Sequence, residues 1–106
     1  MTPPYINRVW QQGRVTSTPT IKSISSRTKV TAFQISTVET WKTGDGTVKE
    51  RKNRVQVEVV GRDAEKTYEE VKLGSWVTLE GYIRSEQFKG QDLMKLRTLS
   101  VHVWSE

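Results

Sequence analysis

Four segments of this chain alternate apolar and polar residues with a period of two, and this pattern constrains the fold more than any other feature. They are Lys29–Val38, Arg54–Val60, Trp76–Phe88 and Leu93–Val103. Successive side chains of a strand point to opposite faces of a sheet, so the alternation predicts strands with one buried and one wetted face. Val, Ile and Thr account for 31 of the 106 residues, and Ala for only two. This bias also favours strands, and one wetted face is typical of antiparallel pairing.

The alternation also predicts which side chains enter the core and which face outward. The residues expected to face inward are Phe33, Ile35, Val55, Val57, Val59, Val77, Leu79, Gly81, Ile83, Leu99, Val101 and Val103. Four outward positions, Arg54, Tyr82, Arg84 and Phe88, are of interest because they place two cations and two aromatic rings on one sheet surface.

A single helix is predicted over Asp63–Leu73. Ala64, Tyr68 and Val71 recur at helical spacing, with charged residues between them. Asp63 is a suitable N-cap, and Gly74 is suited to the position after the helix.

The order of elements predicts a small all-β barrel. A turn at Lys89–Asp92 joins two alternating segments, and Gly44–Gly46 lies in a long polar connection expected from Trp41 to Asn53. Strands, one helix and further strands fit a five-stranded Greek-key barrel of the OB type, with the helix between the third and fourth barrel strands. The alternative, an SH3-like barrel, is not expected to carry such a helix there. We expect residues 1–5 to be a flexible leader and residues 6–106 to form one domain.

Composition excludes most enzyme chemistry. The chain has no cysteine, which excludes disulfides, thiol catalysis and Cys-based zinc sites, and its one histidine, His102, is too few for a Ser/His triad or most other metal sites. Its three aspartates fall in turns or at the helix cap, and Gly44–Gly46 lacks the lysine of a phosphate-binding loop. We therefore predict a protein that is not an enzyme and uses no cofactor or metal. No apolar run approaches the roughly 18 residues of a membrane span.

The basic residues are concentrated, which favours an anionic partner. The net charge is +5, and the first 38 residues contain no acidic residue. A further group of cations lies between residues 42 and 62, namely Lys42, Lys49, Arg51, Lys52, Arg54 and Arg62. By itself such a run is often a solvated hairpin with mixed charges.

Two aromatic residues favour a nucleic-acid site beside these cations. Trp41 comes where a strand is expected to run out into a basic connection, a place with little core to bury an indole, and an exposed ring beside Lys42 can stack a base. Phe88 is a second candidate, although a cap on the barrel end or a subunit contact would also explain it. For Trp10, Trp76 and Trp104 the stronger explanation is packing in the core or in an oligomer.

Several segments resemble the bacterial-type single-stranded DNA-binding proteins and their mitochondrial and phage relatives. The match runs from about Ile6 to Val103, nearly the whole chain, and the segments that carry it are Ile6–Val9, Gly13–Val15, Val30–Thr37 followed by Glu39–Trp41, Val59–Glu65 and Val71–Gly81. The resemblance implies an OB fold that binds single-stranded DNA without sequence preference, in replication, recombination or repair. It also implies a homo-oligomer, typically a tetramer paired through the first strands, although Gln11 and Gln12 stand where such members are apolar.

The resemblance assigns stacking roles to Trp41 and Phe88. The nucleic-acid-binding residues then expected are Trp41, Phe88, Lys42, Lys49, Arg51, Lys52, Arg54, Arg62, Tyr82 and Arg84. Arg54 and Val60 stand where well-studied members have aromatic rings, so we expect fewer rings and relatively more charge. This departure leaves open a second function, a non-catalytic OB-fold adaptor subunit of a primosome or RNA-processing complex.

The family also implies a location and a tail. We expect a cytoplasmic, nucleoid-associated protein, or a mitochondrial one if a transit peptide has been removed. The family's glycine- and proline-rich tail with an acidic tip is absent from this sequence, which ends at Ser105-Glu106. We expect either a trimmed chain or a protein without that means of recruiting partners.

Overall fold

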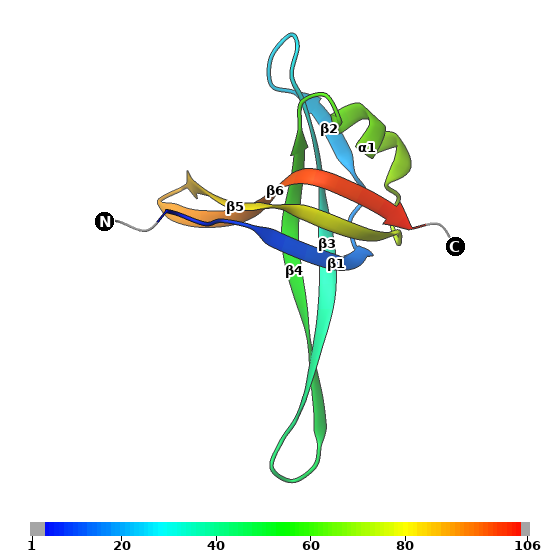
Figure 1. Cartoon of the computed structure of the whole chain (residues 1–106), viewed down its shortest axis with the longest axis vertical. Helices are drawn as coiled ribbons and strands as arrows, with labels where there is room; N and C mark the ends of the chain where they lie inside the picture. Colours follow the sequence, from blue (N-terminus) through cyan, green and yellow to red (C-terminus); the bar gives the residue numbers. More distant parts are fainter. Residues whose placement is uncertain (1–3, 105–106) are drawn as a thin grey trace.

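The fold is known from a computed structural model that describes residues 4–104. It contains six strands and one helix (Figure 1). Their bounds are β1 Val9–Val15, β2 Thr20–Ser23, β3 Lys29–Lys42, β4 Val48–Val60, α1 Ala64–Glu70, β5 Trp76–Phe88 and β6 Gln91–Trp104. Two long hairpins, β3–β4 and β5–β6, project from the body in different directions (Figure 1).

The strands close into a barrel in the order β1-β5-β6-β4-β3-β2, with β1 also pairing with β3. β2 pairs with the first residues of β3, and β1 meets it farther along at Ser36 and Ile35, so β1 and β2 act as two parts of one interrupted strand. The barrel therefore has five strands in effect, and α1, between β4 and β5, takes the position between the third and fourth. The predicted OB-type barrel is confirmed.

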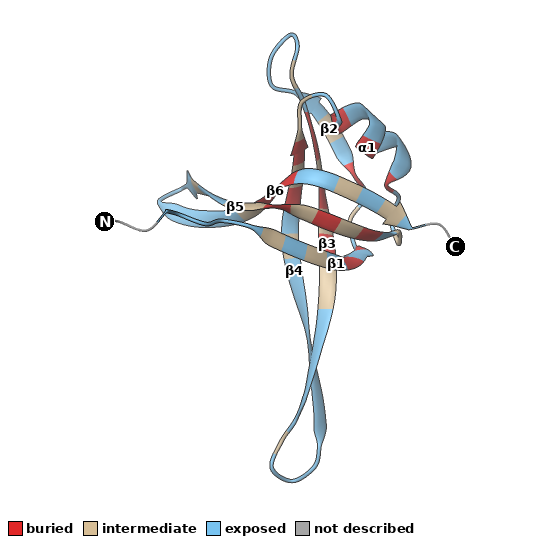
Figure 2. Ribbon diagram, in the orientation of Figure 1, coloured by how far each residue is buried: buried red, intermediate tan, exposed pale blue. Residues whose placement is uncertain are grey.

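The core lies inside the barrel (Figure 2). Six of its nine buried residues were predicted by the alternation to face inward, and Val15, Val71 and Leu96 join them. Phe33, Ile35, Val57 and Leu79 are at most 2% exposed. Each such side chain contributes roughly 1.5–3 kcal/mol to folding when fully buried. Val55, Val101 and Val103 pack against this cluster while partly buried, as expected near the barrel rim.

The prediction that Leu99 faces inward is wrong, because β6 contains a bulge at this residue. Gly81 of β5 pairs with Thr98 and Glu80 pairs with Ser100, which leaves Leu99 as the extra residue, 53% exposed. A bulge shifts the alternation of its strand by one residue. Gly81 belongs to the same feature, since a Cβ there would come within 2.1 Å of the backbone oxygen of Arg97.

The helix is shorter than predicted, since it spans Ala64–Glu70 and not Asp63–Leu73. Of the three residues at helical spacing, Ala64 and Val71 are buried, whereas Tyr68 is exposed and Thr67 is buried instead. Thr31 of β3 donates a hydrogen bond of 2.5 Å to the carbonyl oxygen of Ala64, which fixes the start of the helix against the barrel. Asp63 is at the N-cap but makes no side-chain cap bond.

The predicted polar connection from Trp41 to Asn53 is wrong, because most of it is a two-stranded ribbon. β3 and β4 stay paired as far as Lys42 and Val48, and only residues 43–47 form the turn. Asp45 accepts hydrogen bonds from the Thr43 hydroxyl and, at 3.0 Å, from the Thr47 amide. These bonds, the one from Thr43 foremost, lower the pKa of Asp45 to about 2.

The N-terminal segment is tied to the barrel by one side chain. Asn7 donates a 2.7 Å hydrogen bond to the Ile83 carbonyl and accepts a 3.0 Å bond from its amide, as a paired strand residue would. Of the predicted leader, residues 1–3 lie outside the described residues, and Pro4 and Tyr5 are exposed without regular structure. Within residues 4–104, no helix has the length and apolar character to cross a membrane.

Candidate nucleic-acid interface

One face of the β3–β4 ribbon carries an exposed tryptophan beside basic side chains. Trp41 lies opposite Lys49, and Glu39 on the same face lies opposite Arg51. The indole is 44% exposed and adjoins a shallow pocket formed with Glu39, Thr40 and Arg51. A ring in this setting can stack a base while the neighbouring cations meet phosphates.

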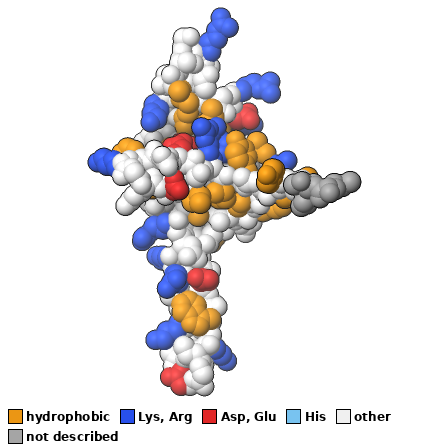
Figure 3. All heavy atoms as spheres, turned by 90° about the vertical axis from the view of Figure 1, so that its left-hand side faces the viewer, with side chains coloured by type: hydrophobic (Ala, Val, Ile, Leu, Met, Phe, Trp, Pro, Cys, Tyr) orange, Lys and Arg blue, Asp and Glu red, His pale blue; other side chains and the backbone are white. Residues whose placement is uncertain are grey.

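The opposite face of the ribbon is basic as well. Lys42, Lys52 and Arg54 alternate with the Trp41 set, so they lie on the other side of the paired strands. In Figure 3, Lys and Arg side chains project from both sides of the ribbon, with a hydrophobic side chain between them. The ribbon therefore offers cations to a polyanion that passes along either side.

The β5–β6 hairpin carries the second predicted stacking residue. Phe88 is 58% exposed, and the Lys89 ammonium lies 5.4 Å from the centre of its ring. Phe88 pairs with Gln91 across a two-residue turn, in which Lys89 and Gly90 both have positive φ. This tight turn holds the ring at the end of a projecting hairpin, open to a ligand.

The outer face of the barrel connects the two hairpins. Glu58 of β4 pairs with Arg97 of β6, and Arg97 pairs with Tyr82 of β5, so these side chains share a face. Arg54 and Phe88 lie on the same face by alternation, as the sequence predicts. Tyr82 is half-buried, whereas Arg54 is exposed.

The centre of this outer face is an ion-pair network that was not predicted. Lys95 lies 3.0 Å from Glu86 and 3.3 Å from Glu58, and Arg97 lies 3.6 Å from Glu58. The hydrogen bond that the Lys95 ammonium donates to the Glu86 carboxylate raises the pKa of Lys95, against the opposing effect of burial, and lowers the pKa of Glu86. The network thus places two carboxylates among the cations that a nucleic acid would meet.

Sequence analysis missed Lys95 and Arg97 because of the bulge. Alternation extended back from Val101 through Leu99 assigns both cations to the inner face, whereas the shift at Leu99 turns them outward. Gly81 was the available signal, since a glycine inside a strand often marks a bulge or a close backbone approach.

A shallow groove of about 180 Å³ lies on the same outer face. Its lining comes from β2, β3, β4 and β6, and consists of Thr20, Lys22, Val30, Ala32, Gln56, Glu58 and Lys95. Five of the seven lining residues are polar or charged. It was not predicted.

Two predicted cations, Arg62 and Arg84, lie outside the β3–β4 ribbon. Arg62 is exposed in the turn between β4 and α1, at the end of β4 away from the ribbon. Arg84 is on β5, where it lies 4.0 Å from Glu86 and pairs with Lys95 across the strands. The structure therefore brings Arg84 to the ion-pair network and Arg62 to the helix end of the barrel.

Three further tryptophans are on the surface and not in the core, which corrects one of the two explanations considered for them. Trp10, Trp76 and Trp104 are 66%, 42% and 50% exposed. Trp76 lies under the Arg14 guanidinium, 4.8 Å from the ring centre. Trp104 donates a 2.8 Å hydrogen bond to Thr78. Together they form a second aromatic surface over β1, β5 and β6.

The sequence model of the Single-strand binding protein family matches residues 6–105. The chain belongs to this family. It is 32% identical to a single-stranded DNA-binding protein of Xylella fastidiosa, over 82% of this chain and 53% of that protein. It is 30% identical to a mitochondrial single-stranded DNA-binding protein of Pongo abelii, over 91% of this chain and 70% of that protein. The chain thus spans about half the length of the Xylella relative.

Solved structures of the single-strand binding family share the fold. A Plasmodium falciparum protein solved in complex with single-stranded DNA superposes with a TM-score of 0.83 at 18% identity, covering 99% of this chain and all of that one. The wild-type Thermus aquaticus protein gives a TM-score of 0.82 at 16% identity, covering 94% of this chain and 50% of that one.

At two positions, Arg54 and Val60, this chain lacks the aromatic residue that the resemblance to the family predicts. Arg54 is exposed at the base of the ribbon, and Val60 is half-buried at the far end of β4, opposite Val30. Neither position supplies a ring, so Trp41 and Phe88 remain as the exposed rings among the predicted binding residues.

Proposed function

We propose that this chain binds single-stranded DNA without sequence preference and thereby serves replication, recombination or repair. Bases stack on Trp41 and Phe88, and the phosphates contact the basic side chains of the ribbon and the outer barrel face. The predicted phosphate contacts are Lys42, Lys49, Arg51, Lys52, Arg54, Arg62 and Arg84, with Tyr82 beside them. Lys95 and Arg97 join this set on the geometry of the barrel face.

The observation that carries the proposal is the setting of Trp41. Its indole is exposed on a projecting ribbon, opposite Lys49 and next to Arg51, in a member of the single-strand binding family. An exposed ring between cations adds nothing to a hydrophobic core, whereas stacking on a base contributes about 1–3 kcal/mol.

A fluorescence titration tests this function. Oligo-dT should quench the tryptophan emission of the chain, and a Trp41→Phe variant should lose most of that quenching. A duplex of the same length should quench little, and an RNA oligomer measures the preference for DNA. The affinity should fall between low and high salt because phosphate contacts release counterions. Absence of quenching with oligo-dT would contradict the proposal.

The alternative function is a non-catalytic OB-fold adaptor in a larger complex. The specific observation in its favour is the absence of rings at Arg54 and Val60, together with carboxylates at the centre of the barrel face. An adaptor would leave oligo-dT unbound while a partner protein still associated with the chain. The titration therefore separates the two functions.

We also propose that the chain forms a homo-oligomer, a tetramer or a dimer, through β1 and the aromatic surface beside it. From Val9 to Gln12, β1 pairs with β5 on one side, and within residues 4–104 no strand pairs with its other side there. Trp10 belongs to this stretch of β1 and is exposed. Analytical ultracentrifugation of the wild type and of Trp10→Ser tests the assembly, which should weaken in the variant. A monomeric wild type would contradict it.

Catalysis and location complete the proposal. The matched family is described by its binding of single strands, and we propose that this chain is not an enzyme. Its relatives include a bacterial and a mitochondrial protein. We assign it to the compartment that holds the DNA, the bacterial cytoplasm with its nucleoid or the mitochondrial matrix. Localisation of a fluorescent fusion beside a DNA stain tests this assignment.

A further inference from the structure

The second half of β6 has a free backbone edge. β4 pairs with β6 only at Leu96 and Arg97, and the bulge at Leu99 follows directly. From Ser100 to Trp104, β5 pairs with one edge of β6, and no other strand in the described part of the chain pairs with the opposite edge of Leu99–Trp104. Alternate N–H and C=O groups of this stretch therefore point away from β5. Such an edge is a template for an additional strand.

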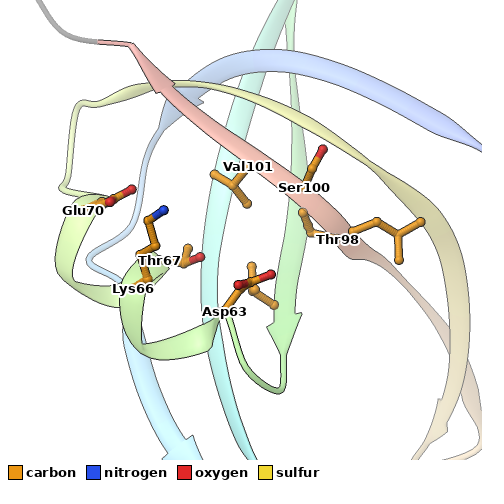
Figure 4. Close-up of a pocket in the computed structure, with 9 residues that line it drawn as sticks. Asp63, Lys66, Thr67, Glu70, Thr98, Ser100 and Val101 are labelled. Carbon is orange, nitrogen blue, oxygen red and sulfur yellow. The ribbon is translucent and has the colours of Figure 1, made fainter.

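A pocket of about 200 Å³ lies between this edge and α1 (Figure 4). Its lining combines polar side chains of the helix region with the bulged part of β6, namely Val59, Asp63, Lys66, Thr67, Glu70, Thr98, Leu99, Ser100 and Val101. Figure 4 shows Lys66, Thr67 and Glu70 on the helix facing β6 across this space. A strand added to the β6 edge would therefore also lie against the side chains of α1.

One buried hydroxyl in the pocket lacks a partner. Thr98 is 7% exposed, and its Oγ1 atom has no hydrogen-bond partner among the described residues. A buried hydroxyl is normally hydrogen-bonded, because leaving it unpaired costs free energy. A ligand that brings a polar group into the pocket would remove this cost.

The charges around the pocket indicate the chemistry of the occupant. Asp63 and Glu70 contribute two carboxylates against one ammonium, Lys66, in a chain of net charge +5. Among the described residues, neither carboxylate lies within ion-pair distance of a cation. Unpaired carboxylates repel phosphates and attract lysine or arginine side chains.

We propose that this edge and pocket bind an extended, basic segment of a partner protein by strand addition. The segment pairs through its backbone with Leu99–Trp104, places a polar group near Thr98, and directs a lysine or arginine toward Asp63 and Glu70. The site lies at the α1 end of β4, away from the ribbon that carries Trp41 (Figure 1). The partner and DNA can therefore occupy the protein together.

The test uses a ten-residue peptide of alternating lysine and valine, with blocked ends, and the isotope-labelled protein in its solution assembly. The peptide should shift the amide resonances of Leu99–Trp104 and slow their hydrogen exchange. The same peptide with alternate backbone nitrogens methylated cannot complete a strand pairing and should have no such effect. A version with glutamate in place of lysine should bind weakly or not at all.

A matched pair of variants locates the charge contact. Glu70→Lys reverses a carboxylate of the pocket, whereas Glu69→Lys makes the same change on the same helix beside a different groove. Peptide affinity should fall about three- to tenfold in Glu70→Lys and stay unchanged in Glu69→Lys. The proposal would be overturned if Glu70→Lys and Glu69→Lys changed the peptide affinity equally, or if the methylated peptide bound as well as the unmethylated one. It would also be overturned if oligo-dT shifted the amide resonances of Leu99–Trp104. Oligo-dT binding measured separately reports on the proposed DNA function alone.

Discussion

Trp41 lies directly opposite Lys49 in the β3–β4 ribbon, one pair before the strands end at Lys42 and Val48. The indole is thus held in place by the backbone pairing of the ribbon, outside the hydrophobic core. A side chain positioned in this way can be removed with little effect on folding. Binding and stability can therefore be measured separately at this position.

Trp41→Ala should weaken binding of single-stranded DNA by about 1–3 kcal/mol, the contribution of one stacked base, while the melting temperature changes little. Phe88→Ala should act in the same direction but less strongly. Oligo-dT titrations followed by anisotropy, with thermal unfolding in parallel, measure both effects. If Trp41→Ala unfolds the domain and any folded fraction binds normally, the indole serves the fold and not the DNA.

The ribbon cations should determine part of the salt dependence. Each phosphate contact contributes a slope of about −0.7 to log K against log[salt] for single strands, so replacing Lys49, Arg51 and Lys52 by glutamine should flatten the slope by about 2. Oligo-dT affinities at several salt concentrations give the slope. An unchanged slope would mean that the ribbon stays in solvent when DNA binds.

The two faces of the ribbon allow a finer comparison of these cations. The Lys49→Gln/Arg51→Gln pair removes two cations from the Trp41 face, and Lys42→Gln/Lys52→Gln removes two cations from the opposite face. If DNA stacks on Trp41, the first pair should flatten the salt slope more than the second. Equal effects would mean that the DNA contacts both faces.

The ribbon turn should lose stability in acid. Hydrogen bonds from Thr43 and Thr47 hold the pKa of Asp45 at about 2, below its ordinary value of 3.8. A lowered pKa means that the ionised carboxylate stabilises the fold above pH 3.8 and that this contribution disappears as the pH falls through 2. Asp45→Asn should speed amide exchange at Val48 and Lys49 near neutral pH. In NMR-monitored unfolding at pH below 2, the turn should be equally stable in Asp45→Asn and in the wild type. A difference that persists there would mean that the substitution acts through the geometry of the side chain and not through its charge.

The barrel could be predicted from sequence where one face of a strand is buried. Only one register places Phe33, Val57 and Leu79 in the core, so the alternation predicted both the strands and their buried faces. The paired strands of the ribbon beyond Val38 could not be predicted, because both faces of the ribbon are exposed and no apolar face indicates which residues pair. At Leu99 the alternation itself misled, since a bulge shifts the faces of all residues before it.

The candidate site divides in the same way. The exposure of Trp41 and Phe88 could be predicted because an aromatic residue beside a lysine at a chain reversal has little core to enter. Glu58 and Lys95 could not be joined from sequence, since their contact depends on the parallel pairing of β4 with β6 and on the bulge. In the structure, Glu58 faces Lys95 and Arg97.

Arg54→Trp should raise the affinity for oligo-dT at high salt, where charge contacts are screened and stacking is not. Arg54 is exposed opposite Ser36, so the larger indole meets no core residue. At low salt the loss of one cation should offset part of the gain, and the salt slope should be less steep than that of the wild type. Weaker binding by Arg54→Trp at both salt concentrations would mean that the DNA follows another path across this face.

Glu58→Gln should strengthen DNA binding and steepen its salt dependence. Glu58 lies 3.3 Å from Lys95 and 3.6 Å from Arg97, so its carboxylate competes with phosphate for both cations. Glutamine keeps the size of the side chain but removes the charge, and each cation freed for a phosphate adds about −0.7 to the slope. Glu80→Gln, which removes a carboxylate 3.6 Å from Arg8 beside the tryptophan surface, is the matched control and should leave the slope unchanged. If Glu58→Gln instead binds more weakly while thermal unfolding shows an intact fold, the carboxylate orients Lys95 and Arg97 for DNA and does not compete with it.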